Sequence, residues 1–451
     1  MEEKNMPVSN LYTSVVAVLM LLIASKVLTL RLSQVISHNA YFLNDWKIFS
    51  ILLIFLLLGG FLSKGIKHVS MRDFLLVLFA LLIFSTQWWV TINSSGIANK
   101  ETVIQILLRY YGVYLICLII LLKLNNINLR LLLNIVIVFI FINSLLGICQ
   151  FFFRDPIVGT IYNGEPIVNS IYYLSGISSS YTWLYNLGAQ VRAFGLVDSG
   201  LTLGLLVVFA LSISFSNFSY LKEGMKVGEV NRAKFIFNIL TIIVLVTSLY
   251  MTLTRNMYLT FANLLLYYFL FTVFKQQGVK VIKIVFLIEW IAGLFYVFLS
   301  NSLYEMLSRV FPDLNIETFN SRVQTYSRLA DLNTSNTLLS NLFGRGIMPS
   351  EDWVIDNDIL SIVSHVGILP YIMMQTILIW IIFKGLNYMS SKGVTEPNSY
   401  YIRGLIIFLM TYPMAATLNY VSYIYFWVAL ITSFLLFNKD VRNEENSLIK
   451  H

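Results

Sequence analysis

About twelve apolar stretches, each close to twenty residues long, recur along this sequence of 451 residues. A helix needs about twenty apolar residues to cross the hydrocarbon of a bilayer, and backbone inside lipid must satisfy its own hydrogen bonds. The sequence therefore predicts an all-α polytopic membrane protein of about twelve transmembrane helices, with eleven or thirteen as the alternatives. The stretches lie at about 11–30, 46–63, 74–92, 103–122, 131–153, 194–216, 235–253, 257–274, 283–300, 359–383, 401–418 and 421–437.

Composition excludes a soluble protein. Hydrophobic residues make up 57% of the chain and charged residues 12%, whereas soluble domains are about one quarter charged. Cys117 and Cys149, the two cysteines, lie inside apolar stretches and predict neither a disulfide nor a metal site. No P-loop or dinucleotide fingerprint occurs, so ATP-driven work is not expected.

The distribution of lysine predicts the orientation in the membrane. Basic residues concentrate in alternate loops, which the positive-inside rule assigns to the cytoplasm. We therefore expect 1–451 to form a single membrane domain with cytoplasmic N- and C-termini. The two long segments, 154–193 and 301–358, are then extracytoplasmic. The basic residues of the inner loops are Lys64, Lys67, Arg72, Lys123, Arg130, Lys222, Lys226, Arg232, Lys234, Lys275, Lys280, Lys283, Lys384 and Lys392.

The outward segments after Lys100 contain arginine as their only basic residue apart from histidine. A guanidinium matches phosphate oxygens with two parallel hydrogen bonds and stays charged in apolar surroundings, so the set favours phosphate recognition. The alternative is that topogenic lysines belong inside and a few surface arginines remain. The arginines are Arg154, Arg192, Arg255, Arg309, Arg322, Arg328 and Arg345.

Four of the charged residues in or beside apolar stretches are candidates for a functional role, because a charge there is costly without a partner. Arg255 separates two stretches and Arg192 precedes another; each is a candidate phosphate ligand, with snorkelling to the lipid headgroups as the alternative. Arg109 lies mid-span and needs a partner, for which Glu289 is a candidate. A structural ion pair and a substrate role are both open for that pair.

The second long segment carries residues suited to acid–base chemistry. Glycines flank Arg345 and permit close approach of backbone to a ligand. Asp356 and Asp358 enter the next apolar stretch, and His365 follows Asp358 by seven residues, which places the two on one helix face. Each can act as a base towards a hydroxyl. The alternatives are aspartates that cap a helix and a histidine packed in the bundle.

Taken in order, these motifs resemble the O-antigen polymerase and ligase superfamily. The resemblance rests on Arg192 with Gly195, on Thr254-Arg255, on Ser321-Arg322, on Leu342-Phe343-Gly344-Arg345-Gly346, and on Asp356-Asn357-Asp358. It covers roughly 192–368, while the first five stretches match in hydropathy alone.

The resemblance implies a GT-C-type membrane glycosyltransferase of the bacterial cytoplasmic membrane. It implies transfer of a glycan from an undecaprenyl-diphosphate donor to an acceptor hydroxyl on the outer face. By motif, Arg192 and Arg255 hold the diphosphate, and Arg322 and Arg345 lie where a loop closes over the substrate. Guanidinium groups can then neutralise the leaving diphosphate without a metal or cofactor. The implied partners are the lipid-linked glycan donor and acceptor and the bilayer. A chain-length regulator is compatible with the resemblance, and a nucleic-acid partner is not expected.

One departure from the family pattern bears on the reaction. Members often carry a His-Asn pair where this chain has Asp356-Asn357-Asp358, and its nearby histidine is His365. Because ligases are the members most associated with that histidine, a polymerase is favoured over a ligase. We rank Asp358 and Asp356 ahead of His365 as the base.

A flippase for the same lipid-linked oligosaccharide is the main rival reading. Transporters are commonly built from internal repeats around a central site, whereas the two halves of this sequence are unlike and its polar residues gather towards one face. The asymmetry favours an enzyme over a transporter.

Overall fold

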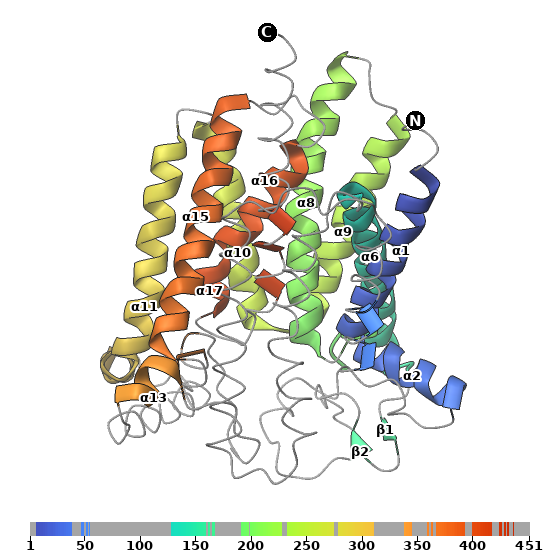
Figure 1. Ribbon diagram of the computed structural model, residues 1–451, viewed down its shortest axis with the longest axis horizontal. Helices are drawn as coiled ribbons and strands as arrows, with labels where there is room; N and C mark the ends of the chain where they lie inside the picture. The colour runs from blue at the N-terminus through green and yellow to red at the C-terminus, as the bar shows by residue number, and fades with distance from the viewer. Residues whose placement is uncertain are drawn as a thin grey trace. The chain divides into compact units, whose positions relative to one another are not determined.

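The computed structural model describes about half of the chain, and the described part is built of α-helices (Figure 1). Within the described residues, five helical segments are long and apolar enough to cross a membrane: Arg130–Phe153, Gly200–Met225, Arg232–Met251, Arg255–Phe274 and Ile368–Ser390. The chain is therefore a helical, multi-pass membrane protein. The described residues are 6–37, 47–48, 51–52, 54, 128–158, 161–162, 165–166, 191–197, 199–227, 232–274, 278–310, 338–344, 359, 362–363, 367–392, 399–416, 424–425, 428–429, 431–432 and 436.

The chain forms two compact units. Unit 1 comprises Met1–Val69, Ile119–Phe261 and Val394–Leu405, and unit 2 comprises Ser70–Leu118, Ala262–Gly393 and Ile406–His451. Unit 1 contains α1 (Met6–Ala24), α2 (Lys26–Ser37), α6 (Leu129–Phe153), α8 (Gly200–Val227) and α9 (Arg232–Met251). Unit 2 contains α11 (Val279–Val310), α13 (Leu338–Phe343), α15 (Ile368–Lys392) and α17 (Tyr412–Ala416). Two helices, α10 (Arg255–Phe274) and α16 (Ser399–Met410), begin in unit 1 and continue in unit 2.

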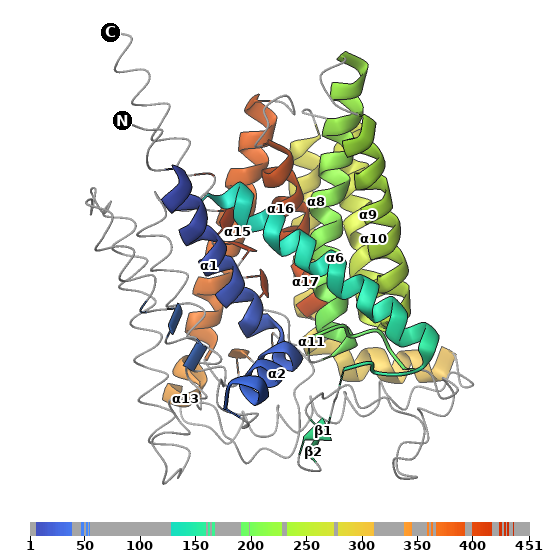
Figure 2. The same cartoon turned by 90° about the vertical axis from the view of Figure 1, so that its right-hand side faces the viewer.

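The helix at the centre of unit 1 is α8. Its apolar window is 67% buried, against 33% for α6 and for α9, so the latter two leave much of their surface for lipid. Both views show α8 and α9 side by side, with α6 running obliquely across them (Figures 1 and 2). Asn128 starts α6, because its side-chain Oδ1 accepts a hydrogen bond from the Leu131 amide at 3.2 Å.

Small residues allow close helix contacts in unit 1. A Cβ atom at Gly404 of α16 would lie 2.7 Å from the Ile213 Cα atom of α8, and one at Gly204 of α8 would lie 2.6 Å from Met257 of α10. Helices in lipid associate largely through packing, which is best where small residues let backbones approach. These glycines therefore fix how α10 and α16 lie against α8.

The apolar stretch 11–30 is two helices rather than one straight span. α1 ends at Ala24 and α2 begins at Lys26, with a bend of 102° between them. The backbone groups freed at the bend find other partners: the Val27 amide donates to the Leu196 carbonyl at 3.2 Å, and the Thr29 hydroxyl donates to the Leu22 carbonyl at 2.5 Å. Hydropathy predicted the apolar length correctly and gave no signal of the bend.

The predicted span 194–216 starts later in the structure. The chain at 191–197 is not helical and contains a turn at Gly195 and Leu196, and α8 begins at Gly200. In the sequence between α6 and α8, two strands of two residues each pair in antiparallel fashion: β1 (Ile161–Tyr162) and β2 (Glu165–Pro166). Ile161 lies opposite Pro166.

A polar chain of side chains ties three helices of unit 2 together. The Trp290 indole of α11 donates to Gln375 Oε1 of α15 at 3.1 Å, and Gln375 Nε2 donates to the Tyr412 hydroxyl of α17 at 3.2 Å. The break between α16 and α17 lies two residues before Pro413, which lacks an amide hydrogen and crowds the preceding turn. The predicted span 401–418 is therefore interrupted at Thr411.

Two predicted boundaries in unit 2 also change. α11 continues from Val279 to Val310, so the first ten residues of the predicted loop 301–358 are helical. The predicted span 359–383 is interrupted at Gly367, which has a φ of +100°. A helical turn ends at Gly367, and α15 begins at the next residue, Ile368. The Gly367 amide donates to the Val363 carbonyl at 3.1 Å, which closes that turn.

Candidate functional site

The non-helical segment 191–197 lies in the interior of unit 1. Val191, Ala193, Phe194 and Val197 are all buried, with Ala193 and Val197 fully so. Non-helical backbone at membrane depth is tolerated only where protein or a water-filled cavity supplies hydrogen-bond partners. The segment must therefore be held by groups from the surrounding helices.

Gln150 of α6 makes four hydrogen bonds, three of them with the segment. Its Oε1 accepts from the Phe194 amide at 3.1 Å and from the Gly195 amide at 2.8 Å. Its Nε2 donates to the Gly195 carbonyl at 3.0 Å and to the Pro156 carbonyl at 2.9 Å. One buried amide thus replaces the helical hydrogen bonds that the segment lacks.

Asn143, two turns earlier on α6, holds the next residue of the segment. Its Oδ1 accepts from the Leu196 amide at 2.7 Å. Gly195 has a φ of +62°, and a Cβ atom there would lie 2.7 Å from Asn143 Oδ1. Both the backbone conformation and the close approach require glycine at this position.

Arg192 belongs to this held segment and lies beside the turn between α9 and α10. The Ala193 amide donates to the carbonyl of Met251, the last residue of α9, at 3.0 Å. The turn that follows is tight, because Leu253 has a φ of +50°, and Arg255 is the first residue of α10. Folding thus brings the backbones of Arg192 and of the Arg255 turn into one place, although 62 residues separate them in sequence.

Helix starts surround the same place. A Cβ atom at Gly200, the first residue of α8, would lie 3.7 Å from Arg192 Cβ and 3.1 Å from the Thr252 carbonyl. Ser199 caps α8 by accepting from the Thr202 amide at 3.1 Å, so its side chain satisfies one amide of the first turn. Helix starts carry partial positive charge, so α8 and α10 reinforce the two arginines. The arrangement is suited to binding an anion such as a phosphate; Asp198 lies outside the described residues.

Two tyrosines cover the turn between α9 and α10. The rings of Tyr250 and Tyr258 stack with centroids 6.4 Å apart, and the Tyr258 hydroxyl donates to the Tyr250 carbonyl at 2.5 Å. The Arg192 charge acts electrostatically on Tyr258, so the guanidinium and this phenol are near neighbours. The aromatic pair thus joins α9 to the first turn of α10.

Glu289 lies on α11, among donors from α10. Asn263 Nδ2 and the Tyr267 hydroxyl both donate to its carboxyl oxygens, and both donor side chains are buried. Sequence reasoning offered Arg109 as the partner of Glu289, and Arg109 lies outside the described residues. The structure adds two neutral partners that the sequence did not indicate.

The remaining predicted site residues lie outside the described part of the chain. They are Arg322, Arg345, Asp356, Asp358 and His365, so their arrangement stays a prediction. Among the described residues, no group of three histidine, cysteine, aspartate or glutamate side chains could hold a metal ion.

Sequence reasoning missed Asn143 and Gln150. The available signal was two amide side chains seven residues apart inside an apolar stretch, which places them on one helix face. Buried amides in lipid are costly unless they bond to something, so such a pair indicates a non-helical segment nearby.

Comparison with models of known protein families, with curated proteins and with solved structures finds no match to this chain. The function therefore has to be argued from the residues themselves.

Proposed function

We propose that the chain is a polysaccharide polymerase. It joins undecaprenyl-diphosphate-linked oligosaccharide units into a surface polysaccharide, an O-antigen or capsule, on the outer face of the bacterial cytoplasmic membrane. The observation that carries the proposal is the assembly of Arg192 beside the Arg255 turn at the starts of α8 and α10. Fixed cations and helix starts aimed at one point stabilise the charge that develops on a leaving diphosphate.

In this proposal the bilayer contains about twelve helices in a GT-C-type arrangement. Arg192 and Arg255 bind the donor diphosphate, and Arg345 and Arg322 close over it. Asp358 or Asp356, or failing these His365, accepts the proton of the acceptor hydroxyl as the new glycosidic bond forms. The bond from the anomeric carbon to the diphosphate breaks, and undecaprenyl diphosphate leaves with the electron pair.

Deletion of the gene tests the proposal and separates it from its rivals. A polymerase deletion should collapse the surface glycan ladder, seen by gel electrophoresis, to single repeat units that still reach the surface. Loss of a ligase would instead leave full-length polymer on the polyprenyl lipid. Loss of a flippase would leave single units trapped on the inner leaflet, and either of these patterns would refute the assignment.

The orientation can be tested independently of the reaction. In a variant lacking Cys117 and Cys149, single cysteines placed within 154–190 or 301–357 should react with a membrane-impermeant thiol reagent in intact cells. Cysteines in the lysine-rich segment 222–234 should react only after the cells are opened, because the positive-inside rule assigns it to the cytoplasm. The reverse labelling pattern would invert the orientation.

A further inference from the structure

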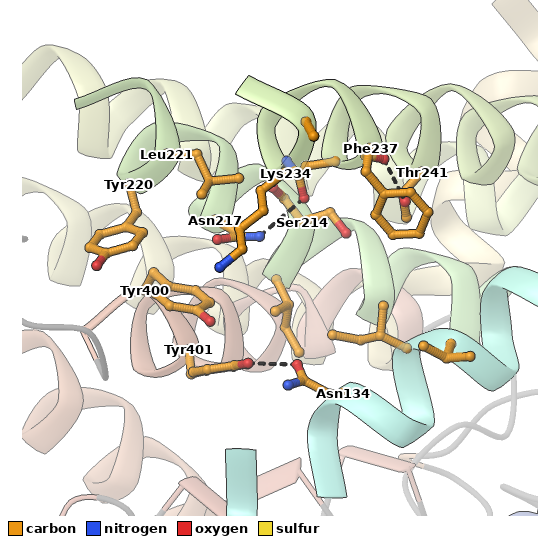
Figure 3. A pocket seen from close by; sticks show the side chains of 15 residues that line it. Asn134, Ser214, Asn217, Tyr220, Leu221, Lys234, Phe237, Thr241, Tyr400 and Tyr401 are labelled. Carbon is orange, nitrogen blue, oxygen red and sulfur yellow. Dashed lines mark hydrogen bonds between the residues drawn. The ribbon is translucent and has the colours of Figure 1, made fainter. Parts of the chain in front are cut away.

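A cavity of about 680 Å³ lies in unit 1, at the opposite end of the helices from Arg192. It is bounded by α6, α8, α9 and the first turn of α16 (Figure 3). Basic residues gather at this end, where α6 and α9 begin and α8 finishes: Arg130, Lys222, Lys226, Arg232 and Lys234. The cavity is therefore separate from the site of the proposed reaction, and nothing argued for it depends on that reaction.

The mouth of this cavity is cationic and aromatic. Lys234 reaches across it towards Asn217 and Tyr400 (Figure 3). The Tyr220 and Tyr400 rings stack at its edge, with centroids 5.3 Å apart. Within the described residues the Lys234 ammonium makes no hydrogen bond or ion pair, and none of the lining residues is acidic. The mouth thus presents a positive charge available to an anion.

The amide groups of the lining are satisfied by each other. Asn217 Nδ2 donates to Asn238 Oδ1 at 3.2 Å, and Asn238 Nδ2 donates to the Ser214 carbonyl at 3.1 Å. The Tyr401 hydroxyl donates to Asn134 Oδ1 at 2.6 Å. These bonds join α8 to α9 and α6 to α16, so each of these two walls of the cavity is held in place.

The part of the cavity nearer the middle of the helices is apolar. It is lined by Ile137 and Val138 of α6, Ile213 of α8 and Phe237 of α9. Val138 and Phe237 are 53% and 60% exposed, so the cavity opens sideways onto the face that would meet lipid. One cavity thus combines a cation at the ends of the helices with an apolar channel towards their middle.

We propose that this cavity binds one anionic phospholipid. Its phosphate lies against Lys234 beside the stacked rings of Tyr220 and Tyr400, and one acyl chain follows Val138 and Phe237. The charge and polarity of the cavity match those of such a lipid along the depth of the membrane. Basic pockets between transmembrane helices bind acidic headgroups, and the hydrocarbon chain below the headgroup needs an apolar channel. A soluble anion would use the lysine and leave the apolar channel empty.

Native mass spectrometry of the full-length protein in detergent tests the proposal. With phosphatidylglycerol and phosphatidylcholine of identical chains added together, the wild type should retain phosphatidylglycerol preferentially. Lys234→Gln should lower that preference about fivefold, the effect typical of one basic residue at an anionic surface. Val138→Trp, which fills the apolar channel, should reduce the retention of both lipids at this site.

Lys280→Gln is the matched control, because Lys280 is an exposed lysine at the start of α11 that does not line the cavity. It should keep the wild-type preference. Equal retention of the two lipids by the wild type would overturn the proposal, as would an equal loss in Lys234→Gln and Lys280→Gln. Displacement of phosphatidylglycerol by millimolar inorganic phosphate would also overturn it, by showing a site for free phosphate rather than lipid.

Discussion

Arg255→Lys should abolish polymer formation, with a loss of transfer rate of about 100-fold or more, the usual effect of removing one preorganised donor from developing charge. Lysine keeps the positive charge at the start of α10 and loses the planar fork that binds two phosphate oxygens at once. The measurement is ladder length in a deletion strain carrying the variant at matched protein level. It is followed by single-turnover transfer with the purified protein.

Arg232→Lys provides the matched control, since Arg232 is also the exposed first residue of a helix in unit 1 and lies at the end away from Arg192. It should give normal ladders. If Arg255→Lys gave normal ladders too, Arg255 would be a headgroup anchor and the diphosphate assignment would be wrong. Arg192→Ala is expected to behave as Arg255→Lys does.

Hydropathy correctly predicted the helices that are continuous apolar runs long enough to cross a bilayer. The stretches 131–153, 235–253 and 257–274 correspond to α6, α9 and α10 within a few residues. The reason is that an apolar run in lipid has few options, because every backbone group must be satisfied within the protein. Helix is the default solution, and it needs no information from other parts of the chain.

The breaks were missed because their stabilising partners are distant in sequence. The bend at Ser25 uses the Leu196 carbonyl, and the non-helical segment at 191–197 uses the side-chain amides of Asn143 and Gln150. A hydropathy window gives an apolar residue the same score whether or not its backbone is helical. Gly195 and Gly367 carried a hint, since a glycine inside an apolar stretch can mark a positive φ.

The candidate site was predicted in part. Arg192 and Arg255 stood out because a charge beside an apolar stretch is expensive. Their shared location did not follow from the sequence, since it depends on the Ala193–Met251 hydrogen bond. Gln150, which bonds to the Phe194 and Gly195 backbone, looked like one polar residue in a long apolar run.

Gln150→Leu should release the segment that carries Arg192. The substitution keeps the volume roughly constant and removes both hydrogen bonds to the Phe194 and Gly195 amides, together with those to the Gly195 and Pro156 carbonyls. Each buried group left without a partner costs about 1–3 kcal/mol, so the local opening free energy should fall by about 3 kcal/mol. The Phe194 and Gly195 amides should then exchange hydrogen for deuterium about 100-fold faster, as read by mass spectrometry of the peptide that contains them.

A graded series distinguishes this cause from general damage to the bundle. Asn143→Leu removes one hydrogen bond of the segment, the one that the Leu196 amide donates. Hydrogen exchange at that amide should therefore rise about tenfold, the effect expected for the loss of one bond. Gln34→Leu, at an exposed amide on α2, should leave exchange in 191–197 unchanged. If Gln150→Leu accelerated exchange equally along α6, α8 and α9, Gln150 would stabilise the bundle as a whole. If exchange rises only in 191–197 and polymer formation is lost with it, then Gln150 acts by positioning Arg192, and the arginine must be held in place to serve the proposed reaction.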